Sequence, residues 1–391
     1  MHINKITITD IGGINELSLS FNRKMNIICG PNGIGKTTIL ECVAYSCSSD
    51  SSEILKRRAN CPSGKIVASI HRTAQQADYV RTIDVNIFEP EKLVSTYLAE
   101  NDIIKNLLSL KVARTFIYQS LGSVSRDADR STHICSSGNT KGVPINDVKN
   151  WFVNRYLYSA HPNALTPAQI SNFEHSKKFF SMLNPDFQFS HVDASSNEII
   201  VNTPAGQIIY EYLSSGFKST LSILFGVTKE LEFRFKNEGT QIEEFEGVIL
   251  IDELELHLHP EWQARMVEVL KKAFPCAQFI VSTHSPHIIQ TAQPDEIISL
   301  VQDGNVVKQK QVASGKYGFQ GWTVEEILFD VMGMEDTRTA IYHQAMAKFQ
   351  NAVTEDNYEM GEIAFRQLEE MLHHQNHLRK LLAFQLGALK G

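Results

Sequence analysis

Hydrophobic and polar residues alternate along much of the first quarter of the chain, which predicts strands. Four segments show the period of two that a strand with one buried face requires: 3–9, 17–21, 65–71 and 79–85. The last two flank a short polar stretch and are expected to pair antiparallel. An unbroken apolar run at 25–29 leads through a glycine-rich loop into a helical pattern at 36–46, as in a buried strand followed by a helix.

The middle of the chain predicts a helical insertion and a small β-meander. Residues 131–143 are rich in Ser, Gly and Thr and predict an exposed loop. Helical patterns follow at 148–158 and 167–182. Short alternating segments predict strands at 114–118, 187–190, 198–202 and 207–210, of which the last three form the meander.

The second half of the chain predicts parallel strands joined by a helix. A buried strand at 248–251 precedes a helical pattern at 260–273, which leads to another strand at 278–282. Strand, helix and strand in this order favour parallel pairing through a crossover helix. Farther on, the segments 297–301 and 306–311 flank an Asp-Gly pair and predict a hairpin.

The C-terminal segment predicts an acidic pair of helices. One apolar stripe contains Phe365, Leu368 and Leu372, a second lies within 378–389, and the two are joined near 373–376 as in a helical hairpin. From 321 to the end there are six basic and eleven acidic residues, a net charge of −5 out of −7 for the whole chain. Such a tail is a poor DNA clamp, and its stripes are expected to pack on the chain's own core or against a partner.

Composition limits the class of protein but not its function. Hydrophobic residues make up 42% and charged residues 21% of the 391 residues, which is ordinary for globular domains. No apolar run approaches the roughly 18 residues of a membrane span, and no secretory signal is visible, so we expect a cytoplasmic protein without membrane contact. Six cysteines are dispersed without a CxxC pair, which argues against zinc and disulfides. Because the chain is mildly acidic, binding of nucleic acid requires a local basic patch.

The strongest chemical motif follows the apolar run at 25–29. Eight residues match the phosphate-loop pattern GxxxxGK[ST]: Gly30, Pro31, Asn32, Gly33, Ile34, Gly35, Lys36 and Thr37. Such a loop turns backbone N–H groups and a helix N-terminus toward phosphate oxygens. We expect Lys36 to reach the β- and γ-phosphates of ATP, Thr37 to bind Mg²⁺, and Thr38 to line the nucleotide site beside them.

The second motif is the apolar strand at 248–251, which ends in Asp252 and Glu253. A buried strand of this kind carries its carboxylates to the sheet edge beside the phosphate loop. Asp252 is expected to complete the Mg²⁺ shell with Thr37, since Mg²⁺ takes few protein oxygens and keeps several waters. Glu253 is expected to orient or deprotonate the attacking water.

Two further segments resemble parts of ABC-type ATPase heads. The sequence LSSGFK at 213–218 resembles the LSSGE(K/R) signature, with Phe217 where Glu or Gln is usual, and THSP at 283–286 is similar to the switch-histidine segment. The resemblance implies that His284 lies beside Glu253 as a catalytic residue. It also implies a set of contacts to ATP held by a second copy of the chain, made by Ser214, Ser215, Gly216 and Lys218. Gln119 is then a candidate Q-loop ligand for Mg²⁺, or simply a polar residue that closes a strand.

The sequence DELELHLHP at 252–260, with STHSP downstream, narrows this resemblance. It is similar to the OLD-like branch of prokaryotic AAA-family, ABC-class ATPases, which includes those of Septu, PARIS and retron-linked antiphage systems, and more distantly to RecF, Rad50 and SMC heads. The implied fold is an α/β ABC-type P-loop NTPase head, with a mixed sheet, flanking helices and an antiparallel β subdomain. Four segments are expected: ATPase core at 1–140 and 185–315, a helical insertion at 141–184, and a helical tail at 316–391.

The resemblance implies a function as well as a fold. We expect an Mg²⁺- and ATP-dependent ATPase that forms a head-to-head homodimer, alone or within a higher oligomer. It is expected to act as the regulatory subunit of a two-component antiphage system and to control a nuclease, of HNH type, on a separate chain. One alternative is a RecF- or Rad50-like ATPase that clamps DNA, for which 56–58 and 177–178 are the available basic clusters. An ABC transporter ATPase is another.

Two polar groups have a second interpretation. His257 and His259 could ligate zinc, but no third ligand with suitable spacing is visible, and the resemblance makes them loop residues that face the dimer. Asp127 and Asp129 form a DxD pair of the kind found in nucleases, yet they lie in a polar stretch before the insertion and are expected to belong to a loop.

Overall fold

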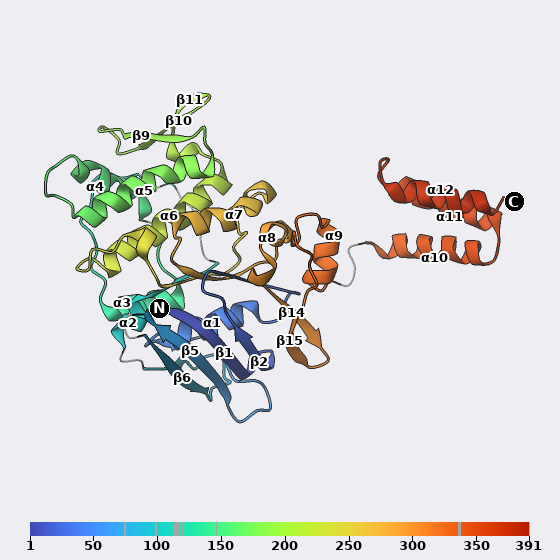
Figure 1. Ribbon diagram of the computed structural model, residues 1–391, viewed down its shortest axis with the longest axis horizontal. Helices are drawn as coiled ribbons and strands as arrows, with labels where there is room; N and C mark the ends of the chain where they lie inside the picture. Colours follow the sequence, from blue (N-terminus) through green and yellow to red (C-terminus); the bar gives the residue numbers. More distant parts are fainter. Residues whose placement is uncertain are drawn as a thin grey trace. The chain divides into compact units, whose positions relative to one another are not determined.

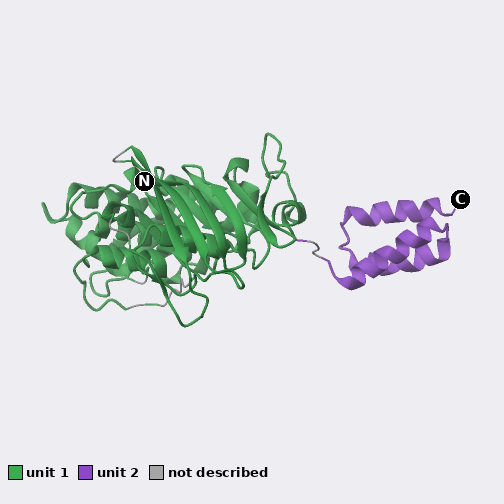
Figure 2. Cartoon of the chain, turned by 90° about the horizontal axis from the view of Figure 1, so that it is seen from below, with its two compact units in different colours: residues 1–333 green, residues 334–391 purple. Residues whose placement is uncertain are grey.

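The computed structural model describes residues 1–73, 76–97, 100–112, 118, 120–145, 147–334 and 338–390. The chain divides into two compact units, Met1–Gly333 and Met334–Gly391 (Figure 2). Across the part of the chain that is described, no helix is long and apolar enough to cross a membrane.

A six-stranded sheet in the order β15-β14-β3-β13-β12-β8 forms the centre of unit 1. Its strands are β3 (Met25–Cys29), β8 (Leu107–Leu110), β12 (Val248–Ile251), β13 (Gln278–Ser282), β14 (Ile297–Asp303) and β15 (Val306–Lys310). All neighbours are parallel except the β14–β15 hairpin. The parallel pairing places the carboxyl ends of β3, β12 and β13 at one edge, so the loops that follow them meet there.

One face of this sheet is covered by α1 (Lys36–Ser46) and an antiparallel sheet in the order β2-β1-β5-β6. The strands of the second sheet are β1 (His2–Ile11), β2 (Ile14–Ser20), β5 (Gly64–Arg72) and β6 (Ala77–Val85). The predicted pairing of 65–71 with 79–85 is confirmed by the β5–β6 register. Alternate residues of β1, such as Ile6 and Ile8, are fully buried, which explains the period of two in the sequence.

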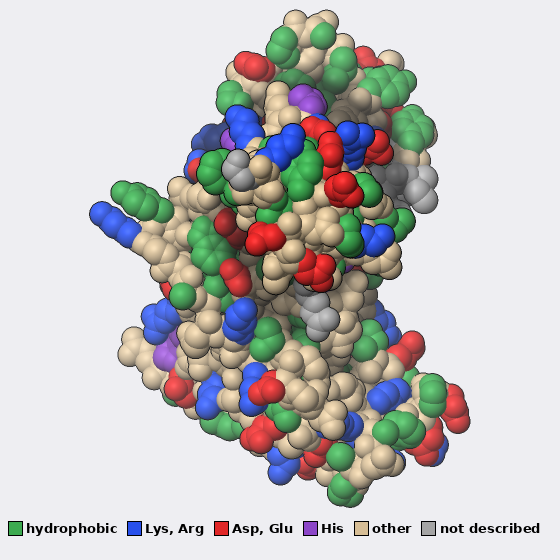
Figure 3. Space-filling view, turned by 90° about the vertical axis from the view of Figure 1, so that its right-hand side faces the viewer, with side chains coloured by type: hydrophobic (Ala, Val, Ile, Leu, Met, Phe, Trp, Pro, Cys, Tyr) green, Lys and Arg blue, Asp and Glu red, His purple; other side chains and the backbone are tan. Residues whose placement is uncertain are grey.

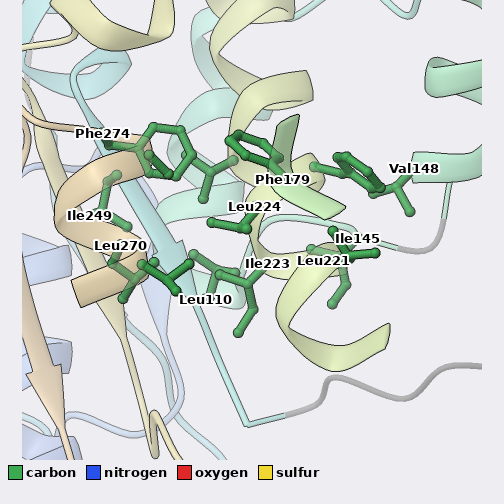
Figure 4. Packing of buried hydrophobic residues seen from close by; sticks show 14 of the residues in the cluster. Leu110, Ile145, Val148, Phe179, Leu221, Ile223, Leu224, Ile249, Leu270 and Phe274 are labelled. Carbon is green, nitrogen blue, oxygen red and sulfur yellow. The ribbon is translucent and has the colours of Figure 1, made fainter. Parts of the chain in front are cut away.

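The opposite face of the central sheet packs against helices (Figure 1). They are α4 (Val148–Ser159), α5 (Pro167–Leu183), α6 (Ser215–Arg234) and α7 (Pro260–Ala273). Figure 4 shows Leu224 of α6 in one cluster with Ile249 of β12 and Phe179 of α5. The meander beside these helices consists of β9 (Gln188–Val192), β10 (Ile199–Thr203) and β11 (Gly206–Ile209), as predicted.

Residues 131–143 are not the exposed loop that their composition predicts. They contain α3 (Thr132–Lys141), whose N-cap Ser131 accepts a hydrogen bond from the Ile134 N–H. Asn139 is fully buried and its Nδ2 donates to the Ile104 carbonyl at 2.9 Å. Small polar side chains are therefore buried here because backbone groups satisfy them. The strand predicted at 114–118 lies largely outside the described residues.

The described part of unit 1 also contains shorter elements. They are β4 (Ser51–Ser52), β7 (Val94–Ser95), α2 (Asn101–Lys105), α8 (Pro286–Thr291), α9 (Val324–Glu326), the π-helical turn η5 (Ile327–Val331) and the 3₁₀ turns η2 (Tyr210–Tyr212), η3 (Ile242–Glu244) and η4 (Pro294–Glu296). The segment with α9 and η5 packs against Cys29 and Ile289. Residues 316–333 consequently belong to unit 1, although the sequence places them in the tail.

The described residues of unit 2 form three helices with a small core of their own. They are α10 (Ala340–Thr354), α11 (Tyr358–Met371) and α12 (His377–Ala388). Each helix contributes buried residues to one hydrophobic cluster, among them Phe349, Leu368 and Leu382. The predicted hairpin is confirmed as α11 and α12, and α10 packs on it as a third helix.

Candidate active site

The phosphate loop follows β3 and ends at the first turn of α1, as the motif predicts. Gly30 has φ +142°, and a Cβ atom there would lie 2.5 Å from the carbonyl oxygen of Leu300 in β14. Gly33 has φ +76° and faces open space. The first glycine is thus required by the neighbouring strand, and the second by a backbone conformation that leaves the loop accessible to phosphate.

Lys36 lies at the start of α1 and is only 5% exposed. Its Nζ donates to the carbonyl oxygens of Gly30 at 2.8 Å and Pro31 at 2.9 Å. Burial lowers the pKa of Lys36, while the charges of Asp252 and other nearby acids act in the opposite direction. The ammonium is therefore held inside the curve of the loop, where a phosphate would meet it.

Thr37 and Asp252 come together at the sheet edge. The Thr37 hydroxyl donates to Asp252 Oδ1 at 3.3 Å, and the Ser282 hydroxyl donates to the same oxygen at 2.5 Å. A hydroxyl beside a carboxylate is the hard oxygen donor set that Mg²⁺ prefers, so these residues fit the ion. Gln119, the other predicted Mg²⁺ ligand, lies outside the described residues.

Glu253 follows Asp252 in a left-handed backbone conformation, with φ +48°. Its N–H donates to the Ser282 hydroxyl at 2.8 Å, so Ser282 links both acids to the end of β13. Non-glycine residues rarely adopt this conformation, and they persist in it only where surrounding contacts enforce it. Ser282 was not singled out in the sequence, although its position at the end of a strand beside the acids is a usable signal.

His284 lies half-buried two residues beyond the end of β13. Burial lowers its pKa, and the charge of Lys36 lowers it further, against the opposing charges of Glu255 and Glu253. His284 contacts this group of acids through the hydrogen bond from its backbone N–H to Glu255 Oε1. The hydrogen bond between Thr37 and Asp252 shows that the phosphate loop and the acid-bearing end of β12 lie side by side, while the role of His284 beside Glu253 stays a prediction.

The signature residues begin α6. Ser214 is its N-cap and accepts a hydrogen bond from the Phe217 N–H, and both Ser214 and Ser215 are exposed. A Cβ atom on Gly216 would lie 3.2 Å from the Trp262 ring. Lys218 Nζ donates to the Glu211 carbonyl within the same chain at 2.8 Å.

The burial of Phe217 explains why this position departs from the Glu or Gln that is usual in the signature. Phe217 is 1% exposed, and its ring lies 5.1 Å from that of Phe187 and 5.3 Å from that of Trp262. The position is thus part of the hydrophobic core in this chain. The departure is visible in the sequence but its cause is not, because both ring partners are distant in the sequence.

Three of the four remaining polar candidates have partners within the chain, and His257 is exposed. His259 is the N-cap of α7, accepting from the Glu261 N–H, and His257 is exposed with φ +65°. Among the residues described, no group of three or more His, Cys, Asp or Glu could hold a metal ion. Asp127 binds Arg155 at 2.7 Å, and Asp129 lies 3.4 Å from Lys236.

A phosphate loop, a strand-end acid pair and a histidine just after the adjacent strand define this fold and site as an ABC-type P-loop ATPase head. Family models described as "AAA domain" and "AAA domain, putative AbiEii toxin, Type IV TA system" match residues 5–155 and 154–290. The fold is similar to that of an SMC head bound to the C-winged helix domain of ScpA, with a TM-score of 0.52 and 16% identity over 79% of this chain and 98% of that one.

The curated relatives are more specific. The chain is 41% identical to the Septu protein PtuA of Bacillus thuringiensis, with 98% of each chain covered. A retron Ec83 probable ATPase from Escherichia coli is 29% identical over 44% of this chain and 31% of its own length. The chain therefore belongs to the Septu PtuA family and is an ATPase of antiphage defence.

Proposed function

We propose that the chain binds and hydrolyses Mg-ATP in a head-to-head homodimer and thereby controls a nuclease of HNH type on a separate chain. The observation that carries the first part is the convergence of Lys36, Asp252 and His284 at the carboxyl ends of three adjacent parallel strands. Lys36 and Thr38, in the first turn of α1 at the end of the phosphate loop, are expected to bind ATP. Thr37 and Asp252 are expected to hold Mg²⁺. Glu253 would take up a proton from the attacking water.

The exposed signature supports the dimer. Ser214 and Ser215 are exposed residues at the N-terminus of the twenty-residue helix α6, where N–H groups and the helix dipole favour an anion. Gly216 packs against Trp262 at this end of the helix, which fixes its position. In a head-to-head dimer this helix end would meet the γ-phosphate held by the other copy.

Unit 2 supports a protein partner. Ile363 on α11 is 71% exposed and Phe384 on α12 is 78% exposed, although the unit has its own buried core. In the view of Figure 3, acidic, basic and hydrophobic side chains are interspersed, and the Lys and Arg side chains do not gather into one continuous patch. A mixed surface of this kind suits a protein contact better than a DNA clamp, which needs a concentration of positive charge. Membership in the Septu PtuA family supports the assignment to a defence complex.

Replacing Glu253 with Gln tests the hydrolytic role. The amide cannot accept the proton from water, so we expect ATP to stay bound and turnover to fall by at least about a hundredfold, the range of a lost general base. The dimer should accumulate with ATP, measured by light scattering. Lys36→Ala is the matched control and should lose ATP binding itself. Turnover by Glu253→Gln within about threefold of the unmodified chain would show that another group is the base.

Coexpression tests the proposed control of a nuclease. The chain and its candidate nuclease should copurify, and nuclease activity should change with ATP in the complex of the unmodified chain but not in that of Lys36→Ala. ATP-dependent binding of duplex DNA by this chain alone, with affinity falling steeply as salt rises, would instead support the DNA clamp.

A further inference from the structure

Glu255 joins the loop after β12 to the switch-histidine segment. Its Oε2 accepts a hydrogen bond from the Thr283 hydroxyl at 2.7 Å, and its Oε1 accepts from the backbone N–H of His284 at 2.5 Å. Both carboxylate oxygens are therefore engaged by consecutive residues. Such bonds to an ionised carboxylate are about twice as strong as neutral ones.

The same two segments are joined at a second point by Gln263 of α7. Its Nε2 donates to the Leu258 carbonyl at 2.8 Å, and its Oε1 accepts from the Ser285 hydroxyl at 2.5 Å. Thr283 also accepts from the Ser285 N–H at 3.0 Å, which closes the turn between the two points. The loop and the switch-histidine segment thus form one connected body.

The backbone of the acid loop is fixed to the end of β13 as well. The Leu254 N–H donates to the Ser282 carbonyl at 2.9 Å, and the Leu256 N–H donates to the Glu253 carbonyl at 2.9 Å. Glu255 therefore projects from a loop whose position relative to the strand is already set. Its carboxylate connects this loop directly to the backbone of His284.

We propose that Glu255 is a positioning residue for hydrolysis, which acts by holding the His284 backbone at a fixed place beside Glu253 and the phosphate loop. The inference rests on the proposed function, which makes His284 and Glu253 part of the hydrolytic site. Glu255 does not take the proton from water. Its charge and both of its oxygens serve the two donors of the switch-histidine segment.

The test compares turnover and ATP affinity in Glu255→Gln. An amide offers one acceptor oxygen, and its NH₂ group would face a second donor, so one of the two hydrogen bonds is lost. We expect turnover to fall about 10- to 100-fold, with the Kd for a fluorescent ATP analogue within about threefold of the unmodified value. Glu268→Gln is the matched control: it removes the same charge from an exposed pair with Lys272 and should leave both quantities unchanged.

A double variant separates positioning through His284 from a general loss of structure. If Glu255 acts through the imidazole, Glu255→Gln should cause little further loss in a chain that already carries His284→Ala. Independent losses that multiply would overturn the proposal. If His284→Ala alone is neutral, the proposal also fails, while the Glu253→Gln result still decides the proposed hydrolysis.

Thr283→Val provides a second approach if Glu255→Gln folds poorly. It removes one of the two donors to Glu255 and should give a smaller loss of turnover, again with ATP affinity retained. Thermal unfolding of each variant checks that it is folded at the assay temperature. A fall in ATP affinity that matches the fall in turnover would overturn the assignment.

Discussion

Replacement of Phe217 by Ala tests whether this signature position belongs to the core. The Phe217 ring is 1% exposed between the rings of Phe187 and Trp262. Truncating a buried Phe to Ala removes transfer free energy and leaves a cavity, at a cost of about 3–5 kcal/mol. The two ring contacts place the expected loss in the upper part of this range, since each aromatic pair adds about 0.5–1.5 kcal/mol beyond burial.

The assay is equilibrium unfolding in urea, followed by Trp fluorescence. Tyr212→Ala is the control because that side chain, five residues earlier, is 77% exposed and should contribute within about 0.5 kcal/mol. The m-value should stay constant, so that the change in midpoint reports stability. A loss below about 1 kcal/mol for Phe217→Ala would refute the core assignment.

Replacement of Phe217 by Glu sharpens the same argument. Glu is common at this position in ABC signatures, but here the carboxylate would enter a site without polar partners on its two aromatic sides. Because an unpaired buried charge costs more than a cavity, Phe217→Glu should be less stable than Phe217→Ala. Equal or greater stability would show that the ring packing contributes little.

Two further predictions concern buried charge. Arg155 is 1% exposed and binds both Glu232 and Asp127 at 2.7 Å. Arg155→Met leaves Glu232 buried without its cation and should lower the free energy of unfolding in urea by about 3–5 kcal/mol. The control Lys236→Met, at an exposed ion pair, should lower it by less than about 1 kcal/mol. An equal loss for the two would contradict this. His284 should titrate below its ordinary pKa of 6.5, since burial and the positive Lys36 both disfavour the imidazolium; NMR of the ring resonances measures this, and a midpoint above 6.5 would contradict it.

Local sequence patterns were sufficient to predict an element where burial follows a regular pattern along that element. The predicted helix at 36–46 and strands at 25–29, 248–251 and 278–282 match the observed bounds of α1, β3, β12 and β13. The pattern failed at 131–143, where burial of Asn139 and Ser136 against other elements outweighed a loop-like composition. Propensity is a weak prior of this kind, and tertiary contacts override it.

The sequence by itself was enough to predict a nucleotide site. The phosphate loop needs glycines and a lysine at fixed spacing, and the acids must follow a buried strand, so Lys36 and Asp252 were recognisable without coordinates. Tertiary structure alone decided which residues support them. Segments far apart in the chain are joined by three contacts of this kind: the hydrogen bonds of Ser282 with Asp252 and of Glu255 with His284, and the ring contact of Phe187 with Phe217. Periodicity records which face of an element is buried, but it does not record what that face meets.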